Sequence, residues 1–155
     1  PFTPPITFPT SGDVVVTAAF REKLEASGLS GLSYETVTLA TAVPLRWETW
    51  DRTGSLPPVM PPSGEPEDYV PPEKHDPECA LQIGKLWEIQ APKWGHGTAT
   101  RLGFWKYAYQ LDVRPDYPDF FRVDGLGSMF VSERARDWLA DATGEWVSFE
   151  AATSN

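Results

Sequence analysis

The side chains best suited to chemistry are two histidines and the single cysteine, His75, His96 and Cys79. His75 and Cys79 stand four residues apart, and with Asp76 and His96 they could be drawn as a zinc site. A structural zinc site usually shows two closely spaced ligand pairs, whereas here each pair would be incomplete. We therefore expect no metal and no other cofactor, and we interpret Cys79 as a buried, inert thiol.

His96 lies between two glycines in the stretch 94–98. Flexible glycines could bring its imidazole to a substrate, but a turn between two strands explains the same residues, and we predict the turn. The sequence also has no phosphate-cradling glycine loop and no nucleophile elbow. We expect no catalytic residues. The alternative is an enzyme that uses His96 with Cys79 or a nearby acid.

Carboxylates are concentrated in the first half of the chain. The 155 residues carry a net charge of −9, and residues 65–78 alone hold six acids against one lysine. No basic stripe is present to neutralise phosphates, which argues against nucleic acid as a partner. This charge distribution favours a basic protein surface as the partner.

These carboxylates lie in a proline-rich stretch. Residues 54–78 hold eight prolines, which cannot donate to strand ladders and which keep the backbone extended. The stretch is either a solvated loop or linker, or an arm that presents carboxylates to a partner. For a docking arm we predict a defined set of partner-binding residues, in which three acids steer and one tryptophan anchors: Glu65, Glu67 and Asp68, with Trp50 or Trp94.

The elements that must position these groups begin with two segments that align without a gap. Residues 12–35 and 127–150 share six identities at an offset of 115 residues, and six further pairs keep their hydrophobic, hydroxyl or acidic character. Each segment predicts a strand, a helix and a second strand. Thr17 and Ser132 are placed to cap the two helices. The apolar spacing of the helices puts two leucines in the core, Leu24 and Leu139.

Between these segments the pattern is that of half-buried antiparallel strands. Apolar and polar residues alternate over 81–89 and 104–113, and residues 46–50 could add a third strand. With 41% hydrophobic residues and seven tryptophans, the chain can fill a core. We predict a single α+β domain over 1–155, built on a small mixed or antiparallel sheet, with 54–78 as a loop or linker.

No apolar run reaches the roughly 18 to 20 residues needed to span a bilayer, and no signal-like segment opens the sequence. A single cysteine excludes an intramolecular disulfide, which suits a reducing compartment. We therefore expect a soluble protein of the cytoplasm with no membrane partner.

Five stretches together carry a resemblance to a known family: 14–32, 75–79, 119–123, 130–134 and 147–150. They resemble bacterial immunity proteins of polymorphic-toxin systems, in particular the double-CxxCG group and related small immunity domains. This chain has no CxxCG pair, so the zinc knuckle that the family name suggests is not carried over.

The resemblance implies a stoichiometric inhibitor that binds one cognate toxin and performs no chemistry. Many such toxins are nucleases with basic clefts, toward which a carboxylate-rich surface can steer and which it can then occlude. The alternatives are the enzyme described above and a phage- or secretion-associated structural adaptor.

Overall fold

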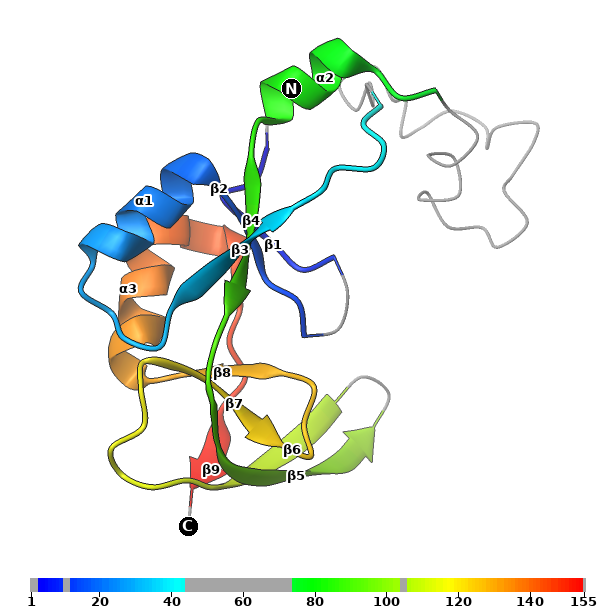
Figure 1. The fold of residues 1–155 in the computed structure, drawn as a ribbon. Coiled ribbons are helices and arrows are strands. Elements are labelled where there is room, and N and C mark those ends of the chain that lie inside the picture. The colour runs from blue at the N-terminus through cyan, green and yellow to red at the C-terminus, as the bar shows by residue number, and fades with distance from the viewer. Residues whose placement is uncertain (1–2, 10–11, 44–73, 104–105, 155) are drawn as a thin grey trace. The chain divides into compact units, whose positions relative to one another are not determined.

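The computed structural model describes residues 3–9, 12–43, 74–103 and 106–154. This part of the chain contains α-helices and strands in two sheets, the α+β fold that the sequence predicts (Figure 1). The chain divides into two compact units, one of residues 1–3 and 38–84 and the other of residues 4–37 and 85–155. None of the described helices has the length and apolar character of a membrane span.

In the first unit the described secondary structure is helix α2, Pro77–Ile83. The carboxylate of Asp76 caps its N-terminus, and Pro77 supplies a backbone angle suited to the first turn. The strand predicted from residue 81 is therefore wrong at its start, because residues 81–83 complete this helix. Gly84, with φ 74°, then ends it.

The second unit contains both sheets, and the first of them is a four-stranded antiparallel sheet in the order β1-β2-β4-β3. Its strands are β1 Ile6–Thr7, β2 Val15–Thr17, β3 Ser33–Val37 and β4 Leu86–Gln90. Val16 pairs with Trp87 at the centre of the sheet, and both Val16 and Ile89 are fully buried. The strand predicted at 46–50 lies outside the described residues.

The other sheet is five-stranded and mixed, in the order β8-β7-β5-β6-β9. Its strands are β5 Lys93–Gly103, β6 Lys106–Asp112, β7 Phe120–Asp124, β8 Met129–Val131 and β9 Ala152–Ser154. The turn predicted at 94–98 is wrong, because these residues lie inside β5. Gly95, with φ 83°, and a register shift between Lys93 and His96 bend the strand without ending it.

Helix α1, Ala18–Ala26, follows β2 directly, and helix α3, Glu133–Thr143, follows β8. Thr17 and Ser132 are their N-cap residues, as predicted. Each hydroxyl oxygen accepts a hydrogen bond from the backbone N–H three residues on, at 3.3 Å for Thr17 and 3.1 Å for Ser132.

After the helices the two aligned segments differ. The first continues into β3, as predicted. The second continues into a 3-10 helix, Gly144–Trp146, and residues 147–150 lie in no strand. β9 begins only at Ala152, and it joins the mixed sheet. The closing strand predicted for 147–150 is therefore wrong, and two equal strand-helix-strand units are not established.

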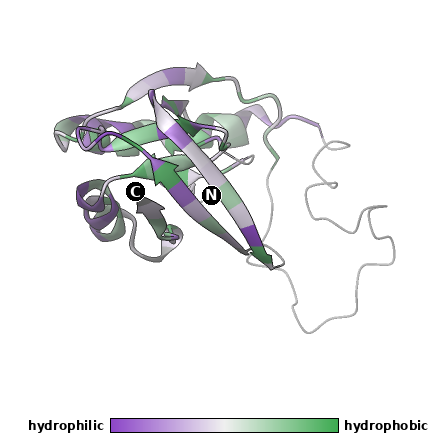
Figure 2. Ribbon diagram, turned by 90° about the horizontal axis from the view of Figure 1, so that it is seen from below, coloured by the Kyte–Doolittle hydropathy of each residue, from purple (hydrophilic) through white to green (hydrophobic). Residues whose placement is uncertain are grey.

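The larger core of the second unit joins the two helices, which lie side by side (Figure 1). Phe20 and Leu24 of α1 and Ala135 and Leu139 of α3 are buried in it, and the ring of Phe20 lies 5.9 Å from that of Trp138. Hydrophilic and hydrophobic stretches both occur along the helices and strands (Figure 2). Helices α1 and α3 each bury one face and leave the other to solvent.

Candidate partner-binding site

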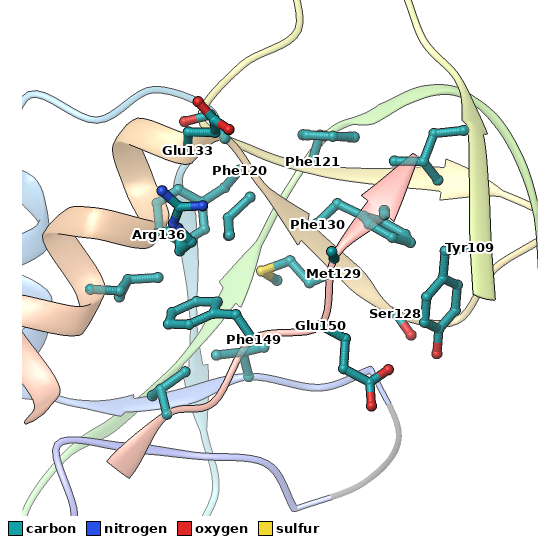
Figure 3. A pocket seen from close by; sticks show the side chains of 18 of the residues that line it. Tyr109, Phe120, Phe121, Ser128, Met129, Phe130, Glu133, Arg136, Phe149 and Glu150 are labelled. Carbon is teal, nitrogen blue, oxygen red and sulfur yellow. The ribbon is translucent and has the colours of Figure 1, made fainter. Parts of the chain in front are cut away.

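A hollow of about 470 Å³ is lined by the mixed sheet, the start of α3 and the C-terminal stretch 147–152 (Figure 3). This volume falls within the roughly 300–1,000 Å³ of ordinary ligand pockets. Aromatic side chains make up much of its wall, among them Tyr109, Tyr117, Phe121, Phe130 and Phe149.

The aromatic wall is held together by ring contacts. Phe121 and Phe130 stack with their ring centroids 5.9 Å apart, and Tyr109 meets Phe130 edge-on at 5.8 Å. Tyr117 lies 5.1 Å from Phe121. Because Phe121 is buried in the smaller apolar core with Leu111, the wall is anchored in the protein interior. A partner would meet a preformed apolar surface, which lowers the entropic cost of binding.

Three aromatic side chains of the hollow are exposed. Phe8 is 55% exposed, Tyr117 37% and Phe149 36%. Phe149 belongs to the stretch 147–150, which follows the 3-10 helix and pairs with no strand. Large exposed rings beside an apolar hollow are typical of protein interfaces.

Charged groups are also present in the lining of the hollow. Glu133, Arg136 and Glu150 contribute to the lining (Figure 3). The guanidinium of Arg136 donates to Asp137 through Nε at 2.9 Å and Nη2 at 2.7 Å, and this hydrogen bonding raises the pKa of Arg136. The lining therefore combines exposed aromatic rings with two carboxylates and one paired cation.

A buried carboxylate fixes the start of α3, which contributes to the lining of the hollow. Asp119 accepts hydrogen bonds from the hydroxyl of Ser132 at 2.7 Å, from the backbone N–H of Ser30 at 2.9 Å and from the Ser30 hydroxyl at 3.0 Å. Arg134 adds an ion pair at 3.1 Å. The Asp119 carboxylate is thus fully engaged in holding α3 and the loop at Ser30 in place.

Burial is the largest influence on the ionisation of Asp119, and it raises the pKa. The hydrogen bonds from Ser132 and Ser30 and the charge of Arg134 act in the opposite direction, and together they outweigh burial. The pKa of Asp119 therefore lies below its ordinary value, so the group is a structural anion rather than a proton acceptor.

Of the predicted binding residues, the structure describes Trp94; the others, Trp50, Glu65, Glu67 and Asp68, lie outside the described residues. Trp94 is half-buried and packs against the smaller core, and the Arg114 guanidinium lies 4.4 Å from its ring centroid. Its indole nitrogen is buried with no hydrogen-bond partner. Trp94 is not among the residues that line the hollow, and its role as an anchor stays a prediction.

The residues drawn above as a zinc or catalytic set belong to different local environments. Nδ1 of His75 accepts a hydrogen bond from the backbone N–H of Ala42 at 3.1 Å, and Cys79 is buried in α2. Within the described ranges no three His, Cys, Asp or Glu side chains gather as a metal site.

His96 is exposed on β5 and has acidic neighbours on both adjoining strands. It stands opposite Asp112 of β6 and opposite Asp124 of β7. Asp124 forms an ion pair with Lys93 at 2.9 Å, and the pKa of Asp124 is lowered by that hydrogen bond, by the charge of Lys93 and by His96. The cross-strand register thus provides the nearby acid that the enzyme alternative requires.

Sequence reasoning missed the residues that border the hollow, Phe8, Tyr117 and Phe149. It sought anchors among the tryptophans, which bury the most area per side chain. The alignment of the two segments pairs Phe149 with Tyr34, which lies in strand β3. In the structure Phe149 instead follows the 3-10 helix and lies in no strand. Residues 147–150 form no strand, and Phe149 is exposed.

The chain matches no protein-family model, no curated protein and no solved structure.

Proposed function

We propose that this protein is an immunity-type inhibitor, which binds a toxin domain in the cytoplasm and blocks it by covering its working surface. The observation that carries the proposal is the hollow of about 470 Å³, bordered by the exposed rings of Phe8 and Phe149. The lining of the hollow is better suited to binding than to catalysis. Its Ser132 hydroxyl and Arg136 guanidinium are already hydrogen-bonded to Asp119 and Asp137.

The expected anchor is a large apolar side chain of the toxin that enters the hollow. An apolar centre with a polar rim concentrates binding energy in a few residues, because the rim excludes water from the central contact. Phe8 and Phe149 would lose their remaining exposure to solvent in this complex. Their burial should mainly slow dissociation.

A basic partner fits the charges. The chain has a net charge of −9, and the lining of the hollow includes Glu133, Glu150 and an Arg136 that is paired with Asp137. Opposite charge accelerates the encounter, and this effect weakens as salt is added. Glu65, Glu67 and Asp68 are the further steering residues that we predict.

The decisive experiment is co-expression with the product of a neighbouring toxin gene. We expect the wild-type protein to restore growth and to co-purify with the toxin domain, and Phe149→Ala or Phe8→Ala to weaken both effects. Leu81→Ala, which truncates an 81% exposed leucine on α2, is the matched control and should behave as wild type. A folded wild-type protein that neither protects nor co-purifies would exclude this proposal.

An enzyme centred on His96 is the second candidate, favoured by the position of His96 between Asp112 and Asp124. A carboxylate beside an imidazole can orient it as a general base. His96→Gln separates the two candidates in the same assay. If the protein inhibits the toxin by binding, the His96→Gln variant should protect cells as well as the wild type does. If it acts as an enzyme, the variant should still co-purify with the toxin but should no longer protect.

A further inference from the structure

The β5–β6 hairpin extends beyond the other strands of the mixed sheet. On one side β7 pairs with β5 only at Lys93 and His96, and on the other side β9 pairs with β6 at residues 109–111. Nearer the Gly103–Lys106 end of the two strands, Thr100 still pairs with Ala108. Among the described residues no third strand joins this part, so it is a two-stranded ribbon with bare edges.

The bare edge of β5 is short and open. Residues 98–103 are all exposed, and a register shift between Arg101 and Gly103 interrupts the ladder. The regular part of the edge is therefore 98–101. A strand edge whose backbone groups lack a strand partner is a template to which a strand of another chain can add.

The ribbon has the opposite charge to the chain as a whole. Residues 97–111 include Arg101 and Lys106 and no acid, in a chain with a net charge of −9. Arg101 stands opposite Tyr107, whose ring lies 6.2 Å from that of Tyr109. Nε of Arg101 donates to the carbonyl oxygen of Gly103 at 3.1 Å, which holds the side chain along the strand. One face of the ribbon thus presents a cation beside two tyrosines.

We propose that residues 98–101 of β5 receive an acidic strand from a partner protein, with a carboxylate of that strand opposite Arg101. Backbone hydrogen bonds supply the pairing, and the cross-strand charge pair selects an acidic strand over a basic one. This contact does not depend on the partner being a toxin.

Charge also decides between this partner and two others. Joining two copies of the chain at this edge would bring two cationic ribbons together, which is unfavourable. A nucleic acid would find only Arg101 and Lys106 within residues 97–111, on a protein whose net charge repels phosphates. An acidic strand can both form backbone hydrogen bonds with the open edge and place a carboxylate opposite Arg101.

The test uses short capped peptides added to the full chain. One peptide alternates glutamate with valine, the second alternates lysine with valine, and the third is the glutamate peptide with a central proline that blocks pairing. Binding is measured by NMR titration, together with hydrogen exchange of the amides of residues 98–101. We expect the glutamate peptide to bind about threefold or more tighter than the lysine peptide, and we expect it to protect these amides. The proline peptide should not protect them.

Two variants of the protein sharpen the test. Arg101→Glu should exchange the preference, so that the lysine peptide binds more tightly than the glutamate peptide. Lys85→Glu makes the same change in net charge at an exposed residue that precedes β4, and it should keep the wild-type preference.

Several outcomes would overturn the proposal. Equal binding of the glutamate and lysine peptides would show that charge does not select the partner. Binding of the proline peptide as tight as that of the glutamate peptide would show that strand pairing is not involved. If no peptide protects the amides of residues 98–101 from exchange, these residues are not the binding site. Concentration-dependent dimerisation that protects these amides would assign the edge to a second copy. Displacement of the glutamate peptide by oligothymidylate would assign it to nucleic acid.

Discussion

Gly12 and Gly127 face each other so closely that a side chain on Gly12 would collide with the carbonyl oxygen of Gly127. The guanidinium of Arg122 donates to both carbonyl oxygens, through Nη2 to Gly12 at 2.6 Å and through Nη1 to Gly127 at 3.2 Å. The two glycines occupy the same place in the aligned segments. Their constraints nevertheless differ, because Gly12 has φ 100° and a Cβ on Gly127 would meet nothing within 4 Å.

This asymmetry predicts unequal effects of the same substitution. Gly12→Ala should lower the free energy of unfolding by about 1–3 kcal/mol, because it combines a strained backbone with a steric collision. Gly127→Ala should change it by less than about 0.5 kcal/mol. Urea unfolding of both variants measures the difference, and equal effects would show that the close approach is absent in solution.

Leu139 offers a test of the helix packing. It is 3% exposed in the core shared by α1 and α3, so Leu139→Ala should cost about 2–5 kcal/mol of the free energy of unfolding. Leu102→Ala, which truncates a 59% exposed leucine of β5, is the control and should cost less than about 0.5 kcal/mol. A small effect of Leu139→Ala would place that face of α3 on the surface.

Asp119→Asn should destabilise the protein at neutral pH by about 1–3 kcal/mol, because an amide nitrogen replaces an oxygen that accepts hydrogen bonds. The folded-state pKa of Asp119 is lowered, so its contribution is present above the unfolded value of about 3.9. It is lost as the pH falls through the folded value. Urea unfolding across this acidic range should therefore show the wild type and the variant converging. A constant difference would contradict the assigned hydrogen bonds.

Tyr34 should show the opposite pH dependence. Burial raises its pKa to about 12, with a further contribution from the charge of Glu25, while Arg21 lowers it. Because the folded protein favours the neutral phenol, the free energy of unfolding is not reduced by Tyr34 ionisation below pH 10, and it falls as the pH rises toward the folded value. Because the hydroxyl is buried without a partner, Tyr34→Phe should be neutral or stabilising at pH 7, and its advantage should grow above about pH 10. Thermal unfolding over this range checks the sign, and a destabilised Tyr34→Phe would point to a partner for the hydroxyl.

Metal independence is predicted from the missing cysteine pairs. A chelator should leave the melting temperature unchanged, because no folding free energy would come from a bound ion. Stoichiometric zinc in the purified protein, together with a lower melting temperature after chelation, would restore the metal site of the double-CxxCG group.

The sequence predicted those features whose causes are local. Capping by Thr17 and Ser132 depends on a hydroxyl three residues from a free N–H, and the burial of Leu24 and Leu139 depends on helical spacing. Helix α2 was not predicted, because the alternation of apolar and polar residues over 81–89 indicated a strand. The sequence Asp76-Pro77, a helix cap followed by a proline suited to the first turn, was the signal for the helix. The hollow could not be predicted, because its wall combines rings from β6, β7 and the stretch 147–150, which meet only after the sheets have formed.

The contacts between Ser30 and Asp119 and between Gly12 and Arg122 also constrain how the chain folds. They join residues separated by 89 and 110 positions, and contacts of this range slow folding because a long loop must close first. During synthesis, α1 would leave the ribosome well before α3, the helix that completes its core. Until then Phe20 and Leu24 would remain exposed, and this interval is when the nascent chain is most prone to aggregate.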